Sequence, residues 1–118
     1  MTAKTVDLAT FGLAEVAADP SGAARQACDR LAESSSRFLV HFDVDVVDFV
    51  DLALADYPQI NRGLGLPQAM TALGVALAHP GCRGLVLTEV NPDHGDERGG
   101  DLTRLIDGLA GAVAAWTS

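Results

Sequence analysis

Two short apolar runs, separated by one helix-like stretch, most constrain how this chain can fold. Residues 38–45 and 85–90 are rich in branched and aromatic side chains, which is typical of strands buried on both faces. Between them, residues 67–78 repeat apolar side chains at helical spacing, and the His-Pro-Gly run at 79–81 stops that pattern. Strand, helix, strand predicts a parallel βαβ unit and therefore the α/β class.

Two more helices are predicted, one on each side of this unit. Asp19-Pro20 is a favourable helix start, ahead of a helix that ends at the serines 34–36. Asp101 can cap a last helix, whose apolar stripe extends to Trp116.

This inventory of strands is too small for a sheet that is stable alone. A two-stranded sheet is only marginally stable in water. The composition of both strands is typical of strands that are buried on both faces, and this remains so even if residues 5–16 add a third strand. We expect one domain over residues 1–118 in a three-layer α/β arrangement that is completed by other residues or by another chain. The irregular stretch from Phe49 to about Leu66 is long for a compact domain, which favours a functional loop.

Composition excludes several classes of protein. The 118 residues have a formal net charge of -8, which repels nucleic acid and anionic lipid. No apolar run approaches the roughly 20 residues of a membrane span, and residues 1–8 lack the features of a signal peptide, so we expect a cytoplasmic protein. Cys28 and Cys82 are expected to be reduced thiols. Lys4 is the one lysine, which excludes P-loop and Schiff-base chemistry.

Asp43 and Asp45 end the first apolar run. Residues two positions apart on a strand project from the same face, with their side chains about 7 Å apart along the backbone. A divalent ion such as Mg, Ca or Mn would offset the charge of the two carboxylates. The alternative is that one aspartate caps the following loop while the other pairs with an arginine. Asp48 either supports a metal ligand or the loop backbone, or makes an Asx-turn.

His41 and Glu89 are the other candidate site residues. His41 shares the face of the two aspartates and either supports or ligates a metal, or is a satisfied core residue. Glu89 ends the second run, where its carboxylate could bind a guanidinium in bidentate fashion. Its alternative is a salt bridge to Arg62 or Arg98. The acidic segment 93–101 around His94 lacks the spacing of an EF-hand and is expected to be a solvated loop.

Taken together, His-Phe-Asp-Val-Asp-Val-Val-Asp at 41–48, Gly-Leu at 63–64 and Thr-Glu-Val-Asn-Pro at 88–92 resemble the arginase, agmatinase and formiminoglutamase family. The resemblance covers about residues 36–116 and corresponds to the C-terminal part of that fold. It implies a two-manganese centre with Asp43 as bridging ligand and Asp45 as a ligand of one ion, and Glu89 facing the guanidinium of a small substrate. The implied reaction is C–N bond hydrolysis that releases urea or formamide, by water that the metal ions activate.

The chain departs from the family pattern in three ways. Phe49 stands where a proline usually follows the third aspartate, and the upstream G-G-D-H and D-A-H-x-D elements, which supply four further ligands in the family, are absent. A two-metal site therefore cannot close on this sequence alone. We expect either a hydrolase fragment or split subunit that needs an N-terminal half or a homo-oligomer, or a non-catalytic α/β module for metal binding or assembly.

Overall fold

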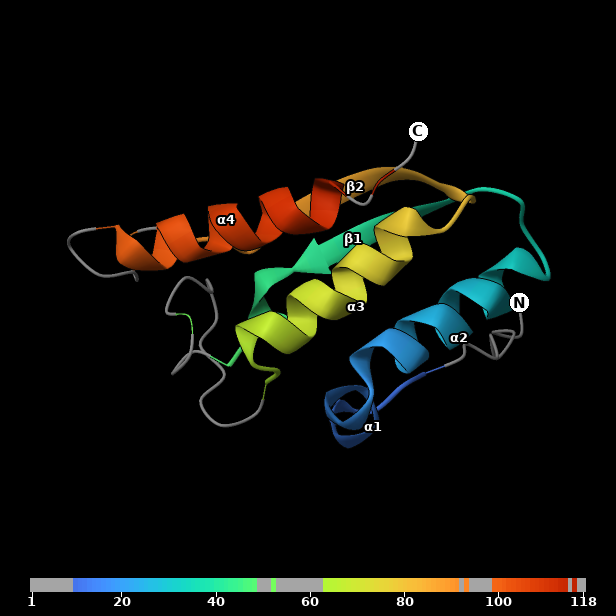
Figure 1. The fold of residues 1–118 in the computed structure, drawn as a ribbon, viewed down its shortest axis with the longest axis horizontal. Helices are drawn as coiled ribbons and strands as arrows, with labels where there is room; N and C mark the ends of the chain where they lie inside the picture. Colours follow the sequence, from blue (N-terminus) through green and yellow to red (C-terminus); the bar gives the residue numbers. More distant parts are fainter. Residues whose placement is uncertain are drawn as a thin grey trace, which may run out of the picture.

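From residue 20 onward, helices and strands alternate along the chain in the order that the sequence predicts, and one further short helix precedes them (Figure 1). A computed structural model describes residues 10–48, 52, 63–91, 93, 99–114 and 116. Its elements are α1 (Leu13–Ala18), α2 (Pro20–Ala32), β1 (Phe38–Asp43), the 3-10 turn η1 (Val44–Val46), α3 (Leu66–Ala78), β2 (Cys82–Thr88) and α4 (Gly100–Ala114). The suggestion of a third strand within residues 5–16 is wrong where the structure describes it, because α1 is helical; residues 1–9 lie outside the described part.

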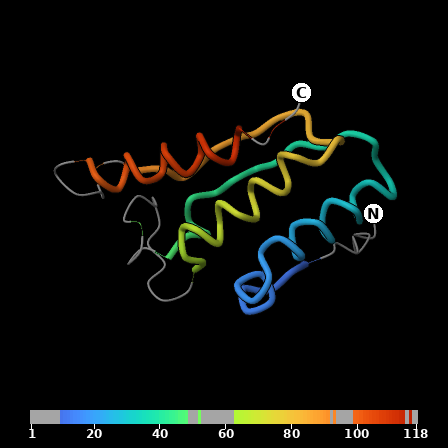
Figure 2. Tube along the Cα trace, in the orientation of Figure 1, coloured from blue at the N-terminus to red at the C-terminus, as the bar shows by residue number. Residues whose placement is uncertain are grey.

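β1 and β2 pair in parallel, and α3 makes the crossover between them (Figure 2). The register places Val40 opposite Leu85 and Asp43 opposite Thr88. Within the described residues the sheet has these two strands. The predicted α/β class with parallel pairing is confirmed.

The strand ends differ from those predicted, for local reasons. β1 stops at Asp43 and not at residue 45, because the Asp43 carboxylate accepts a hydrogen bond of 2.8 Å from the Asp45 N–H and turns the backbone into η1. β2 begins at Cys82 and stops at Thr88, because Glu89 has a positive φ of 66° that an extended strand cannot hold.

The start of α2 follows its predicted cap, whereas Asp101, the predicted cap of the last helix, lies inside the first turn of α4. At α2, the Asp19 side chain accepts from the Gly22 N–H at 3.0 Å, ahead of a proline in the first turn. At α3, the Gln68 side chain reaches back to accept from the Gly65 N–H at 3.0 Å. Its amide also donates to the Ala17 carbonyl at 3.2 Å, which ties α3 to α1.

α3 lies at the centre of the packing, in contact with the sheet, with α2 and with α4 (Figure 1). Its Leu73 and Leu77 are buried in one cluster with Phe42 of β1 and Leu105 of α4. α4 approaches α3 closely because Gly108 carries no side chain: a Cβ there would stand 2.9 Å from Met70 Cγ. The helices therefore form one layer against one face of the sheet.

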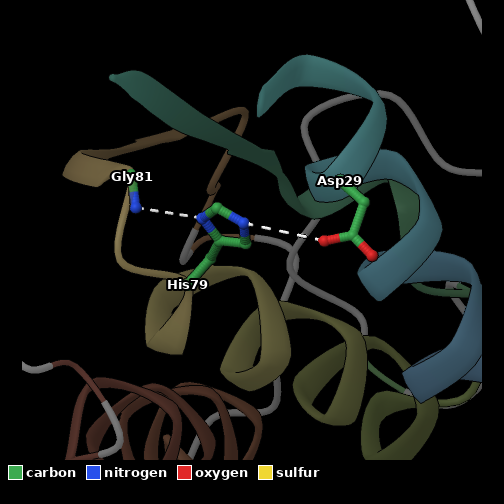
Figure 3. A network of polar contacts seen from close by, with 3 residues as sticks. All are labelled: Asp29, His79 and Gly81. Carbon is green, nitrogen blue, oxygen red and sulfur yellow. Dashed lines mark hydrogen bonds and ion pairs between the residues drawn. The ribbon is translucent and has the colours of Figure 1, made fainter. Parts of the chain in front are cut away.

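The turn from α3 into β2 is organised by His79, as Figure 3 shows. Its Nδ1 accepts from the Gly81 N–H at 2.9 Å, while its Nε2 lies 3.8 Å from the Asp29 carboxylate of α2. The ring also packs against Phe38, with the ring centres 5.2 Å apart. This turn ends α3 where the His-Pro-Gly run predicts.

The opposite face of the sheet carries exposed apolar side chains. Leu39 of β1 is 67% exposed and Val86 of β2 is 46% exposed. The described residues thus supply two of the three predicted layers, the sheet and the helices on one of its faces.

Two remaining expectations concern membranes and thiols. No helix in the described part of the chain combines the length and the apolar character needed to cross a bilayer. Cys28 and Cys82 are both buried and free, which agrees with the predicted reduced thiols. Burial raises the pKa of the Cys28 thiol, and the neighbouring Cys82 and Asp29 raise it further.

Candidate functional site

The carboxyl ends of β1 and β2 meet at one edge of the sheet. Because Asp43 and Thr88 are register partners, the residues that follow each of them, Asp45 two positions on and Glu89 one position on, leave the sheet at the same edge. Parallel sheets place their ligand sites at this edge. The topology therefore brings three of the predicted site residues, Asp43, Asp45 and Glu89, to one end of the fold.

The prediction that the side chains of Asp43 and Asp45 project from the same face of one strand is wrong. Asp43 is the last residue of β1, whereas Asp45 lies in η1, and the spacing of about 7 Å that a continuous strand would give does not apply. Both residues are half-buried. The hydrogen bond from the Asp45 N–H holds one oxygen of Asp43, so the carboxylate has a fixed direction.

Asp48 ties the end of the long loop to the site through its backbone. Its N–H donates to the Leu64 carbonyl at 2.8 Å, and the Leu64 N–H donates to the Val46 carbonyl at 2.8 Å. Gly63 fits here because a Cβ would stand 2.5 Å from the Asp48 nitrogen. The loop therefore returns beside η1. These are contacts of the Asp48 backbone, and the role of its side chain as support for a metal ligand stays a prediction.

His41 is hydrogen-bonded across the sheet. Its Nε2 lies 2.6 Å from the Thr88 Oγ1, which places both side chains on the exposed face of the sheet. His41 is exposed among the described residues, so it is not a core residue within this part of the fold. The hydrogen bond joins β1 to the residue that precedes Glu89, and the role of His41 as support for a metal ligand stays a prediction.

Thr88 was not singled out by the sequence patterns. A threonine inside an apolar run reads as an ordinary strand residue, and its partner is 47 positions away in the sequence. Only the strand register reveals that it can reach His41.

Glu89 stands out by its backbone. It has the one positive φ among the described non-glycine residues, in the left-handed region that costs about 1 kcal/mol for a residue with a Cβ. Such strain is concentrated at functional sites. The side chain is exposed at the end of β2. The suggested salt-bridge partners, Arg62 and Arg98, lie outside the described residues.

The described residues hold no group of three or more His, Cys, Asp or Glu side chains arranged to bind a metal. Asp93 is exposed, with its N–H donating to the Asn91 side chain at 3.1 Å. His94 and the acids at 96 and 97 lie outside the described part. What the described site offers a metal is two carboxylates, which are hard oxygen donors of the kind that Mn²⁺ or Mg²⁺ takes.

Comparison with known proteins shows which fold this chain shares. No protein-family model and no curated protein matches the sequence. Among solved structures, Helicobacter pylori arginase superposes with a TM-score of 0.79 at 14% identity, over 92% of this chain and 35% of that one. The fold is a partial arginase fold. This arginase-like chain spans about a third of the length of the solved structures that it matches.

Two further structures support the arginase-like fold. Bacillus cereus arginase matches with a TM-score of 0.70 at 23% identity, over 87% of this chain and 35% of that one. Trypanosoma cruzi formiminoglutamase, solved with two Mn²⁺ ions, matches with a TM-score of 0.63 at 21% identity, also over 87% and 35%. The predicted resemblance to the arginase and formiminoglutamase family is therefore confirmed at the level of fold.

Proposed function

We propose that this chain is part of a manganese-dependent hydrolase that cleaves a C–N bond of a small guanidino or amidino compound in the cytoplasm. The observation that carries this proposal is the convergence of Asp43, Asp45 and Glu89 at the carboxyl edge of β1 and β2 in an arginase-like fold. Three carboxylates at one edge suit a positively charged ligand and divalent ions.

Asp43 and Asp45 are the residues that would hold manganese. Their oxygen donors fit a hard divalent ion, and the N–H of Asp45 fixes the direction of the Asp43 carboxylate before any ion binds. Manganese, when bound, would lower the pKa of a water molecule and stabilise the charge of the tetrahedral transition state. Two carboxylates are too few for a closed two-metal centre, so the remaining ligands come from another part of the enzyme, an N-terminal half or a neighbouring subunit.

Glu89 would bind the substrate. A carboxylate can accept two parallel N–H donors from a guanidinium, which fixes the orientation of the planar group as well as its charge. The left-handed backbone at Glu89 directs the side chain from the end of β2, and the His41–Thr88 hydrogen bond anchors the strand immediately before it. The strain at φ 66° is then part of how the fold presents this carboxylate.

A second candidate is a non-catalytic module for metal binding or assembly. It is favoured by the absence of a three-ligand group among the described residues. The two candidates differ in what the complete assembly does with a substrate.

Urea-release assays on arginine and agmatine test the choice between these two functions. The chain is assayed with excess Mn²⁺, alone and together with a polypeptide that carries the missing G-G-D-H and D-A-H-x-D elements. The hydrolase proposal predicts release only in the mixture, and loss of that release in Glu89→Gln. Manganese binding in the mixture with no release of urea or formamide from any guanidino or amidino substrate favours the non-catalytic module.

A further inference from the structure

A cavity of about 420 Å³ lies between α2 and the end of α3. The turn at His79 and Pro80, which leads into β2, forms one of its walls. β2 then runs from this turn to Thr88, so the cavity and the carboxyl edge with Asp43 and Glu89 lie at opposite ends of the sheet. A cavity of this size is large enough for a small molecule.

Two opposite charges stand at the mouth of this cavity. Arg25 and Asp29 both line it, and they lie four positions apart on α2, so their side chains project from the same face of the helix. Both residues are exposed, and within the described part of the chain the Arg25 guanidinium makes no hydrogen bond or ion pair. The cavity therefore presents one cation and one anion to a ligand.

His79 defines the Asp29 side of the cavity (Figure 3). Its Nδ1 accepts from the Gly81 N–H at 2.9 Å, so the proton of the neutral ring is on Nε2. Nε2 faces the Asp29 carboxylate at 3.8 Å, which is too long for a hydrogen bond but close enough for electrostatic attraction. The carboxylate therefore keeps its capacity to accept hydrogen bonds from a positively charged ligand group.

The remaining residues that line the cavity are uncharged. Val75 and Ala78 of α3 contribute aliphatic side chains, and Pro80 adds its ring from the turn. Cys28 is 4% exposed, and burial raises its pKa, so the thiol is protonated at neutral pH. These groups suit the hydrocarbon part of a small ligand.

We propose that this cavity binds a free aliphatic α-amino acid in its zwitterionic form. Arg25 would pair with the carboxylate of the ligand and Asp29 with its ammonium group, while the aliphatic side chain would lie against Val75 and Ala78. A simple anion fits less well, because Asp29 and the net charge of -8 repel it, and a simple cation would leave Arg25 unpaired. The proposal does not depend on the hydrolase function, since the cavity lies at the other end of the sheet.

The test titrates the full chain with L-leucine and follows the backbone amide signals by NMR. Isoamylamine, which lacks the carboxylate, and isocaproate, which lacks the ammonium group, are the ligand controls. Arg25→Gln removes the proposed partner of the carboxylate. Arg30→Gln is the matched control, because Arg30 is an exposed arginine of the same helix that does not line the cavity.

The proposal predicts saturable shifts with L-leucine at Cys28 and Val75, and weaker binding of both ligand controls. Arg25→Gln should weaken the Kd for L-leucine by about tenfold or more, and Arg30→Gln should leave it within about twofold of wild type. Spectra of the free variants that match wild type away from the substitution show that the fold is retained.

Three results would each overturn the proposal. The first is the absence of shifts at Cys28 and Val75, including the case in which L-leucine shifts only residues of the carboxyl edge. The second is binding of isoamylamine or isocaproate as tight as that of L-leucine. The third is an equal Kd for L-leucine in Arg25→Gln and Arg30→Gln.

Discussion

The imidazole Nε2 of His41 lies 2.6 Å from the hydroxyl of Thr88, across the two strands of the sheet. Thr88 is the register partner of Asp43 and precedes Glu89 in the chain. This side-chain hydrogen bond therefore adds to the backbone pairing that holds the end of β2 beside the end of β1. The spacing between the proposed metal-binding and substrate-binding carboxylates depends on this end of the sheet.

Removing this hydrogen bond should loosen the site edge more than it lowers global stability. His41→Phe and Thr88→Val each remove one partner while keeping a β-compatible shape, and the double variant completes a cycle. We expect a coupling free energy of about 0.5 kcal/mol, at the low end for a hydrogen bond because the pair is exposed. Urea denaturation at pH 8 measures it. Thr88→Ser, which keeps the hydroxyl, should behave as wild type; zero coupling would count against a structural role for the pair.

Glycine at position 89 should stabilise the chain. Glu89 has a φ of 66°, which glycine adopts without cost, so Glu89→Gly should raise the free energy of unfolding by about 1 kcal/mol relative to Glu89→Ala. The alanine variant removes the same carboxylate but keeps the strained backbone, so it isolates the backbone effect. Equal denaturation midpoints for the two variants would show that position 89 is not held in the left-handed region.

The Cys28 thiol should make stability fall in alkaline solution. Burial, with Cys82 and Asp29 nearby, raises the pKa of Cys28 above its ordinary value of 9.0, so the folded chain keeps a proton that the unfolded chain loses. The contribution is fully present below pH 9.0 and decreases as the pH rises above it. Denaturation between pH 7.5 and about pH 10 should show a steeper loss in wild type than in Cys28→Ala. Parallel curves would contradict the raised pKa.

The βαβ core was predictable because its signals are local. The Asp19-Pro20 helix start, the apolar spacing of α3 and the His-Pro-Gly stop each act within a few positions of the chain. The sequence also predicted that two strands would not make a complete sheet. The structure agrees, because the apolar side chains of Leu39 and Val86 are exposed on one face of the sheet.

The details of the site depend on contacts that sequence patterns do not contain. The carboxylate of Asp43 accepts a hydrogen bond from the Asp45 N–H, and β1 therefore ends two residues earlier than predicted. A strand that continues through residue 45 is equally compatible with the sequence. Likewise, nothing in the run 85–90 distinguishes Glu89 as a left-handed residue. The role of Thr88 follows only from the register with a strand that lies more than forty positions earlier.

The central claim, that Asp43 and Asp45 are a manganese half-site, is tested most directly by thermal and urea unfolding with and without Mn²⁺. At a hundred times the Kd, Mn²⁺ should stabilise the wild-type chain by about 2.7 kcal/mol. The control is Asp43→Asn with Asp45→Asn, because an amide oxygen at position 43 can still accept from the backbone N–H of position 45 and keep η1 intact. We predict that this double variant folds as wild type and loses the response to Mn²⁺. Full manganese stabilisation in the double variant, or none in the wild type, would contradict the account.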